Sequence, residues 1–286
     1  MIKRRLFGLL GMKLEHSLSA LIFNSYFRRK NLDYRYQLFD LSSQNLHQFL
    51  KKASSSPLSG LNVTIPYKER IMAYLDEIEG KAKIIGSVNV IHNEKGKLKG
   101  FNTDYKGFMR SLKNFRPGVR SQTVVLGGGG AARSVIYALH SLGIEKITFF
   151  TRSAERIKRL KDDFSFVTGL EGQLWKENKI KEKSRKAGLI INATPVGMFP
   201  GERCSPFMID FRMRKNVLVY DLIYNPPETR FLKEARSRGA VTENGIRMLI
   251  FQAIESFKIW AKEALDEALF LKTSEEVIHA SLYNRG

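Results

Sequence analysis

Two polar segments in the first third of the chain hold residue types suited to acid–base chemistry. Lys68 closes the segment Gly60–Lys68, which also supplies an amide and a hydroxyl, and Asp104 closes the segment Phe101–Asp104. As an ammonium, Lys68 could donate a proton to a carbonyl oxygen, and as an amine it could accept the proton of an alcohol. A neighbouring carboxylate such as Asp104 would hold that amine in place. Taken singly, a lysine is more often a solvated surface group, and an aspartate can simply open a helix.

A glycine turn in the middle of the chain predicts a dinucleotide site. Residues 123–133 read Thr-Val-Val-Leu-Gly-Gly-Gly-Gly-Ala-Ala-Arg, which is typical of a buried strand, a tight turn and the start of a helix. Gly127 would permit the turn, Gly129 would let the backbone approach a pyrophosphate, and Ala132 would let the helix pack closely. The alternative is a tight turn with only a structural role. The expected cofactor contacts are Gly127, Gly128, Gly129, Gly130, Ala131 and Ala132.

The end of the next predicted strand indicates which cofactor is used. An NAD site usually has an acidic residue there, whereas this chain has Thr151, Arg152 and Ser153, with Arg156 one turn later. Two guanidinium groups suit a 2′-phosphate, so we expect NADP. The alternative is that both arginines are ordinary surface residues of a basic chain. Together, the polar segments and the glycine turn predict hydride transfer to or from a small, oxygen-rich substrate.

The surrounding pattern predicts an α/β fold with two domains. From about residue 105, strands and helices alternate regularly, which favours a Rossmann-like, doubly wound parallel sheet. We expect this NADP-binding domain to span residues 106–245. A smaller α/β substrate domain would combine residues 1–105 with 246–286, and the active site would lie at the carboxyl ends of the parallel strands.

Several helix boundaries follow from local signals. Pro66 is expected to open a helix with Lys68 near its start. A helix over Ala131–Leu142 should end at Gly143. After residue 245, one amphipathic helix is expected to run through Phe270, followed by a short helix over Glu275–Leu282.

Composition narrows the class of protein. The net charge is +20, spread over most of the chain, with its densest basic run at Lys176–Lys186. Such a run could bind nucleic acid, but a solvated basic face is favoured because no aromatic platform accompanies it. The basic amino terminus has no long apolar core behind it, and no apolar run reaches membrane-spanning length. The single cysteine, Cys204, fits a reducing compartment, so a cytoplasmic protein without membrane association is expected.

The motifs, taken in order, resemble the shikimate dehydrogenase family over nearly the whole chain. The resemblance rests on several separate segments, which together are far more specific than any one of them. These segments are Gly60–Lys68, Ile85–Val90, Phe101–Asp104, Gly127–Arg133, Asn192–Met198, Asp221–Pro226 and Gln252–Ala253.

The resemblance implies reversible, NADPH-dependent reduction of 3-dehydroshikimate to shikimate in aromatic amino acid and chorismate biosynthesis. It implies Lys68 and Asp104 as the catalytic pair, and it leaves open whether the protein forms a homodimer. The residues it places around the substrate are Ser17, Ser19, Asn62, Thr64, Asn89, Tyr224 and Gln252, together with Asp104. Thr194, Met198, Leu222 and Gly245 join the cofactor site.

Five positions depart from the family pattern. Lys13 and Ala20 stand where the family has proline, and Phe23 stands where it has histidine. Thr151 stands where the family often has asparagine, and Arg247 where small or apolar residues are usual.

These changes leave the kinetic competence of the enzyme open. One alternative is a broader quinate/shikimate dehydrogenase, against which Arg152 argues. The other is a catalytically weak paralogue with a basic binding surface, against which the presence of both Lys68 and Asp104 argues. His16 has no second histidine or cysteine at ligand spacing, so no metal is expected.

Overall fold

The fold is taken from a computed structural model that describes residues 5–113, 115, 122–261 and 264–283. Contacts divide the chain into two compact units, Met1–Thr103 with Gln252–Gly286 and Asp104–Phe251. We call these unit 1 and unit 2. The expected boundaries at 105/106 and 245/246 therefore fall at 103/104 and 251/252. The second boundary lies inside helix α9 (Ile246–Trp260). The Phe251 ring contacts the Arg110 guanidinium of unit 2, whereas Trp260, at the other end of the helix, is buried in unit 1.

Unit 1 is built on a mixed six-stranded sheet with the order β2-β1-β3-β5-β6-β4. The β1–β2, β1–β3 and β4–β6 pairs are parallel, and β3–β5 and β5–β6 are antiparallel. Lys95 and Gly96, both at positive φ, form the tight turn between β5 and β6. The strands are β1 (Arg5–Gly11), β2 (Tyr34–Asp40), β3 (Leu58–Val63), β4 (Glu77–Ile78), β5 (Val90–Glu94) and β6 (Lys97–Phe101).

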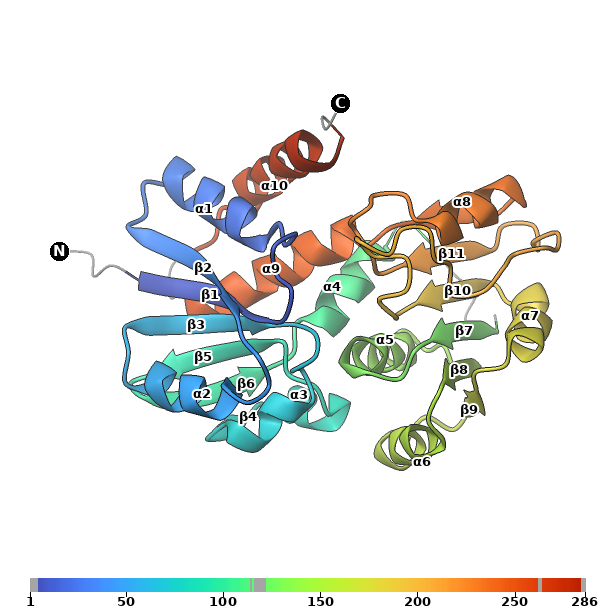
Figure 1. Cartoon of the computed structure of the whole chain (residues 1–286), viewed down its shortest axis with the longest axis horizontal. Coiled ribbons are helices and arrows are strands. Elements are labelled where there is room, and N and C mark those ends of the chain that lie inside the picture. Colours follow the sequence, from blue (N-terminus) through green and yellow to red (C-terminus); the bar gives the residue numbers. More distant parts are fainter. Residues whose placement is uncertain (1–4, 114, 116–121, 262–263, 284–286) are drawn as a thin grey trace. The chain divides into compact units, whose positions relative to one another are not determined.

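Helices cover both faces of this sheet (Figure 1). One face packs on α2 (Leu46–Ser54), the short 3₁₀ helix η1 (Arg70–Tyr74) and α3 (Gly80–Ile85) through an aliphatic core. The other face carries an aromatic core that joins α1 (Ser19–Arg29), α9 and α10 (Glu267–Leu282), and α1 packs directly on α10. Within it, Phe7 stacks on Trp260 at 5.1 Å between ring centroids.

Unit 2 confirms the predicted doubly wound parallel sheet. All strand pairs are parallel, in the order β12-β11-β10-β7-β8-β9. Read from β9, this is the dinucleotide-binding order, with its topological switch point between β7 and β10. The strands are β7 (Thr123–Leu126), β8 (Ile147–Thr151), β9 (Leu170–Leu174), β10 (Leu189–Asn192), β11 (Leu218–Asp221) and β12 (Val241–Glu243).

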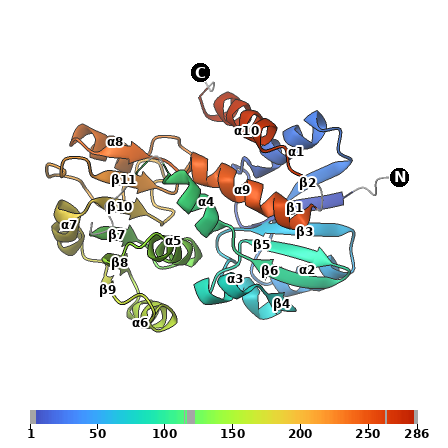
Figure 2. The ribbon, with the colours of Figure 1, turned by 180° about the vertical axis from the view of Figure 1, so that it is seen from behind.

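The helices of unit 2 also lie on both faces, as Figures 1 and 2 show from opposite sides. On one face, Val124, Ile190 and Val219 of the strands pack with residues of α7 (Glu177–Lys186) and α8 (Arg230–Ser237). On the other, Tyr220 packs edge-on against Phe108 of α4 (Asp104–Ser111). Helix α5 (Gly130–Ser141) contacts α4, and α6 (Ala154–Asp163) contacts β8 and β9. Helix α5 stops before Gly143, which has the expected positive φ of 76°.

Two helix predictions are wrong. Pro66 lies in a turn, and no α-helix begins there: the Lys68 carbonyl accepts a hydrogen bond from the Val88 N–H, so it is not used in a helix. The long carboxy-terminal helix is two helices, because α9 ends at Trp260 and α10 begins at Glu267. The Asp266 side chain caps α10 by accepting from the Leu269 N–H, an N-terminal signal that the apolar periodicity concealed.

Candidate functional site

A buried network of amides and hydroxyls lies at the ends of β3, β5 and β6 in unit 1. The Asn62 side chain accepts from the Tyr36 hydroxyl (2.8 Å) and donates to the Ser256 hydroxyl (2.9 Å). The Asn89 amide donates to the Thr103 hydroxyl (3.0 Å) and accepts from the Thr103 N–H (2.6 Å). These polar side chains are almost fully buried. Burying so many polar groups costs folding energy unless each is paired, so the network fixes their orientations.

Gln252 joins the network from α9. Its side-chain oxygen accepts from the Asn89 amide at 3.4 Å, and its carbonyl accepts from the Ser256 hydroxyl at 2.7 Å. Helix α9 therefore delivers Gln252 and Ser256, one turn apart, to the same cluster. Of the residues expected around the substrate, Asn62, Asn89 and Gln252 are brought together. Ser256 and Tyr36 were not expected there, because a helical serine and a strand tyrosine carry no motif of their own.

The serine loop and Thr64 lie in the same unit. The Ser17 hydroxyl accepts from the Ser19 N–H at the start of α1 (3.3 Å). The Thr64 N–H donates to the Leu10 carbonyl (2.9 Å), which ties the segment after β3 to β1. Gly11 permits this packing, since a Cβ there would lie 2.5 Å from the Thr64 methyl group. Both serines and Thr64 thus follow strands whose carboxyl ends are adjacent in the parallel part of the sheet.

The departures from the family pattern have clear structural settings in this unit. Lys13 has a φ of 57°, which a proline ring does not permit, so the backbone of the loop before Ser17 excludes proline at this position. Phe23 is buried and stacks on Tyr36 with centroids 4.6 Å apart and planes 6° apart. It therefore supports the tyrosine that orients Asn62. Ala20 is half-buried in the first turn of α1.

The remaining residues expected at the site are divided between the two units. Lys68 is half-buried in the turn after Pro66, in unit 1, whereas Asp104 is buried and opens both α4 and unit 2. The backbone just before Asp104 is held by the bond between Thr103 and Asn89. Tyr224, expected near the substrate, belongs to unit 2. Arg247 lies over the ring of Phe251 at 5.8 Å.

The glycine turn of unit 2 has the geometry that a nucleotide requires. Gly127 has a φ of 120°, and a Cβ there would lie 3.0 Å from the Ala193 carbonyl, beyond the adjacent strand β10. Gly129 is the N-cap of α5, whose first N–H groups have no partner within the helix. Ala132 is buried where α5 meets the sheet. The turn therefore opens a helix N-terminus at the switch point of the sheet, where a pyrophosphate fits.

Two arginines lie beside this turn. Arg156 donates to the Gly128 carbonyl (3.0 Å), and its aliphatic stem would be 3.0 Å from a Cβ at that glycine. Arg152 follows buried Thr151 and lies over the Trp175 ring at 5.7 Å. Ser153 caps α6 by accepting from the Arg156 N–H (3.2 Å). Both arginine side chains are exposed, so they can meet a phosphate, and no carboxylate stands in the sequence between Thr151 and Ser153.

A second buried network shapes the loop after β10. Asn192 accepts from the N–H and hydroxyl of Thr194 (3.1 and 2.7 Å) and donates to Asp221 (3.0 Å). Asp221 also accepts from the Thr229 hydroxyl (2.7 Å) and the Ile223 N–H (3.1 Å). Burial raises the pKa of Asp221 to about 7, and its hydrogen bonds oppose this rise. The sequence identified Asp221 only as part of a motif. The structure shows that it holds Asn192, which in turn holds Thr194.

Gly245 marks a close approach in the same unit. A Cβ there would lie 2.0 Å from the Leu222 carbonyl, and its N–H donates to the Ile223 carbonyl (2.9 Å). Met198 stands in the loop after β10 and is 41% exposed, so its side chain is accessible to a ligand. A nucleotide ring could cover such a methionine.

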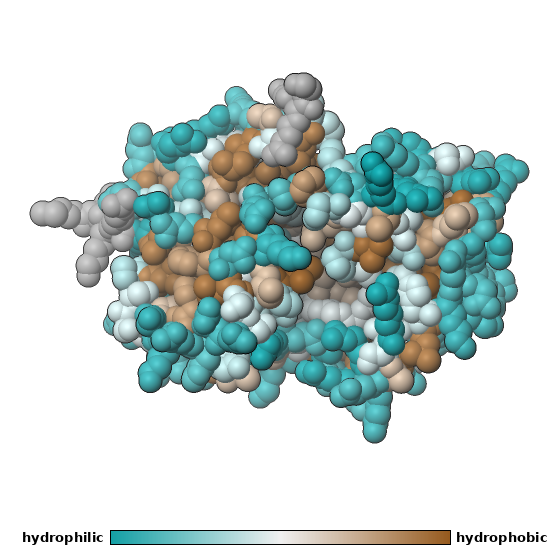
Figure 3. Space-filling model, in the orientation of Figure 1, coloured by the Kyte–Doolittle hydropathy of each residue, from teal (hydrophilic) through white to brown (hydrophobic). Residues whose placement is uncertain are grey.

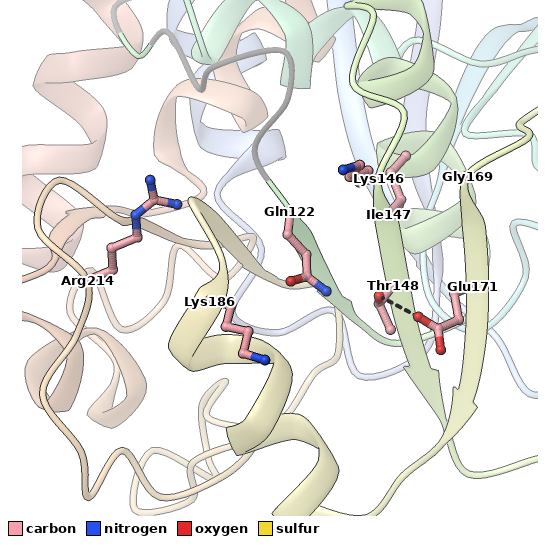
Figure 4. A pocket seen from close by; sticks show the side chains of 8 residues that line it. All are labelled: Gln122, Lys146, Ile147, Thr148, Gly169, Glu171, Lys186 and Arg214. Atoms are coloured by element: carbon pink, nitrogen blue, oxygen red, sulfur yellow. Dashed lines mark hydrogen bonds between the residues drawn. The ribbon is translucent and has the colours of Figure 1, made fainter.

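A cavity of about 460 Å³ opens at the opposite edge of this sheet (Figure 4). It adjoins the amino ends of β7, β8 and β9, whereas the glycine turn follows the carboxyl end of β7. In parallel sheets ligands bind at the carboxyl ends, so this cavity is not the expected nucleotide site. Its lining residues are Gln122, Lys146, Ile147, Thr148, Gly169, Glu171, Lys186 and Arg214.

The dense basic run forms helix α7 and is partly neutralised. Lys181 pairs with Glu177 (2.9 Å) and Asp210 (2.7 Å), and Lys183 pairs with Glu171 (2.7 Å). Figure 3 shows a mainly hydrophilic surface around α7. These pairs describe a solvated, ion-paired face, in keeping with the favoured interpretation of the charge.

Metal ligands and membrane spans are absent from the described ranges. No three His, Cys, Asp or Glu side chains gather there as metal ligands, and His16 lies 4.0 Å from Glu15. The expected absence of a metal stays a prediction. Every helix in the part of the chain that the structure describes is too short or too polar to span a bilayer.

Comparison with known proteins identifies the family. Residues 9–91 match the family model described as the shikimate dehydrogenase substrate binding domain. A curated protein of Methanopyrus kandleri, named shikimate dehydrogenase (NADP(+)), is 38% identical over 262 residues, covering 90% of each chain. The Thermus thermophilus shikimate 5-dehydrogenase, solved in complex with NADP(H) and shikimate, is 32% identical and superposes with a TM-score of 0.82, covering 96% of this chain and 99% of that one.

A reductase with a different substrate in its name also has this fold. The 5-ketofructose reductase of a Gluconobacter species is 30% identical, with a TM-score of 0.78 and coverage of 97% of this chain and 100% of that one. The family model and the identity over nine-tenths of the curated relative carry the assignment. This chain belongs to the shikimate dehydrogenase family.

Proposed function

We propose that the protein catalyses the reversible, NADPH-dependent reduction of 3-dehydroshikimate to shikimate, in aromatic amino acid and chorismate biosynthesis. The buried amide and hydroxyl network of unit 1 carries this proposal. Amides and hydroxyls recognise ring hydroxyls because they both donate and accept hydrogen bonds. A site built this way rejects analogues that lack a hydroxyl, since its own buried groups would lose their partners.

The family relatives support the choice of reaction. The Thermus enzyme was solved with both NADP(H) and shikimate, and it matches this chain over nearly its full length. The proposed substrate contacts are Ser17, Ser19, Asn62, Thr64, Asn89, Tyr224 and Gln252. Ser17 and Ser19 would bind the ring carboxylate by hydrogen bonds, and the net charge of +20 favours the approach of an anion.

Lys68 and Asp104 are proposed as the catalytic pair. The Lys68 ammonium would donate a proton to the substrate oxygen as the ketone carbon is reduced, and in the reverse direction the amine would take the alcohol proton. The Asp104 carboxylate would hold that ammonium in place by charge. Bound NADPH supplies the hydride, so the protein residues need only bind, orient and exchange the proton.

The proposed cofactor contacts follow the glycine turn and the two arginines. Gly127–Ala132 would hold the pyrophosphate at the start of α5, and Arg152 and Arg156 with Thr151 and Ser153 would hold the 2′-phosphate. Thr194, Met198, Leu222 and Gly245 would surround the nicotinamide. We also propose a cytoplasmic enzyme, and a homodimer that analytical ultracentrifugation would test.

An initial-rate assay at 340 nm tests the reaction and the role of Lys68. Wild-type protein, Lys68→Ala and the control Lys83→Ala, an exposed lysine of α3, are compared with shikimate and with either NADP or NAD. We expect NADP to be the better cofactor, the control to match the wild type, and Lys68→Ala to lose roughly 10²–10⁴-fold in kcat.

The substrate panel separates the alternatives. Equal turnover of quinate and shikimate would indicate the broader dehydrogenase, and reduction of 5-ketofructose alone would replace shikimate as the substrate. Folded protein that binds NADP and turns over none of these would favour the weak paralogue. Salt-sensitive DNA binding would then assign a role to its basic surface.

A further inference from the structure

Ser256 occupies the centre of the buried network in unit 1. It is fully buried on α9, and its hydroxyl oxygen lies within hydrogen-bond distance of three groups. These are the Gln252 carbonyl (2.7 Å), the Asn62 amide nitrogen (2.9 Å) and the Thr103 hydroxyl (3.1 Å). A serine hydroxyl has one hydrogen and two lone pairs, so three partners use its full capacity.

Counting hydrogens fixes the direction of each bond. A carbonyl can only accept, so Ser256 gives its one hydrogen to Gln252. It can then only accept from Asn62 and from Thr103. The Thr103 hydrogen is thereby used on Ser256, which leaves the Thr103 oxygen as an acceptor for the Asn89 amide (3.0 Å).

The same count fixes which way the Asn62 amide faces. Its oxygen accepts from Tyr36, and its nitrogen meets a serine that has no hydrogen to offer. Turning the Asn62 amide over would place its oxygen against the lone pairs of Ser256, which is unfavourable. The orientation of the Asn62 amide and the direction of the Thr103 hydroxyl therefore depend on Ser256, whereas the Thr103 N–H fixes the position of the Asn89 oxygen.

We propose that Ser256 is a positioning residue for substrate binding, which acts by fixing the donors and acceptors that Asn62 and, through the Thr103 hydroxyl, Asn89 present to the ring hydroxyls. This inference rests on the proposed function, because it assigns these groups to a polyhydroxylated substrate. Removing the hydroxyl leaves the Asn62 nitrogen with only the Asn89 carbonyl, at 3.4 Å, as an acceptor. It also releases the Thr103 hydroxyl toward its alternative acceptor, the Asn89 side-chain oxygen at 3.4 Å.

Ser274 offers a matched control for the substitution. It is also fully buried, on α10 of the same unit, and its hydroxyl donates to the carbonyl four residues earlier, Phe270, at 2.7 Å. Among the described residues its oxygen has no further hydrogen bond. Ser274→Ala therefore removes the same helical bond as Ser256→Ala without disturbing an amide network.

Steady-state kinetics and thermal unfolding of the wild type, Ser256→Ala, Ser274→Ala and Ser256→Thr test the proposal. We expect Ser256→Ala to raise the KM for shikimate about tenfold, equivalent to about 1.4 kcal/mol, with the KM for NADP unchanged. Ser274→Ala should lower the unfolding temperature about as much as Ser256→Ala does, but it should leave the KM values for shikimate and NADP unchanged. Ser256→Thr, which keeps the hydroxyl, should restore the KM for shikimate.

A Thr103→Val variant keeps the proposal testable if Ser256→Ala does not fold, because it breaks the same link from the other side. The double variant Ser256→Ala/Thr103→Val should have a KM for shikimate no higher than that of whichever single variant has the higher KM. Equal KM values for Ser256→Ala and Ser274→Ala would overturn the positioning role while leaving the proposed reaction intact. A wild-type protein that binds NADP but does not turn over shikimate would overturn the reaction and this inference with it.

Discussion

The buried carboxyl of Asp221 predicts a pH-dependent stability that a single substitution should remove. Its pKa is raised by burial from 3.8 to about 7. One pKa unit corresponds to about 1.4 kcal/mol, so this rise corresponds to about 4 kcal/mol. The pKa of Asp221 is higher in the folded than in the unfolded state. The protonated carboxyl therefore makes its full contribution to the free energy of unfolding below about pH 4, and this contribution is lost as the pH rises through about 7.

Asp221→Asn keeps the shape of the side chain and cannot ionise. Its oxygen can still accept from Asn192 and Ile223, and its nitrogen can face the Thr229 hydroxyl. We expect the free energy of unfolding of Asp221→Asn, relative to wild type, to increase by up to about 4 kcal/mol between pH 4 and pH 8.

Urea unfolding followed by circular dichroism at several pH values measures this difference. Asp210→Asn is the control, because Asp210 is exposed and its hydrogen bond to Lys181 lowers the pKa of its carboxyl. Its difference from wild type should not grow above pH 5. A constant difference between Asp221→Asn and wild type from pH 4 to pH 8 would refute the reasoning. It would mean that the three hydrogen bonds compensate fully for burial of the charge.

Two further predictions concern the nucleotide site. Arg152→Ala and Arg156→Ala should each raise the KM for NADP about tenfold or more and leave the KM for NAD nearly unchanged. The reason is that a hydrogen bond to a charged phosphate contributes about 1.5–3 kcal/mol. An equal rise in KM for both cofactors would contradict the proposed contact with the 2′-phosphate. Gly245→Ala should destabilise the fold by about 1–3 kcal/mol, because its Cβ would lie 2.0 Å from the Leu222 carbonyl. Gly80→Ala is its control in a thermal melt, since a Cβ there meets nothing within 4 Å; equal melting temperatures would contradict the close approach.

Local patterns in the sequence were enough to predict the nucleotide turn and the parallel sheet. The apolar run before Gly127, the glycines and the following helix indicated the turn, because strand, turn and helix are adjacent in the chain. Regular strand–helix alternation indicated the sheet of unit 2, since parallel strands need such crossovers. Local signals gave a wrong helix at Pro66, because the Val88 N–H donates to the Lys68 carbonyl. They also missed the start of α10, where the Asp266 side chain caps the helix within a continuous apolar pattern.

The folded structure was needed to establish which polar groups meet. Asn62 is 26 residues from Tyr36 and 194 from Ser256, and no local periodicity could pair them. Ser256 carries no motif, and only the packing of α9 on the sheet gives it three partners. Asp221 likewise becomes a high-pKa carboxyl only because neighbouring strands bury it beside Asn192. Hydrogen-bond direction and burial depend on distance in space, so they emerge only when the chain is folded.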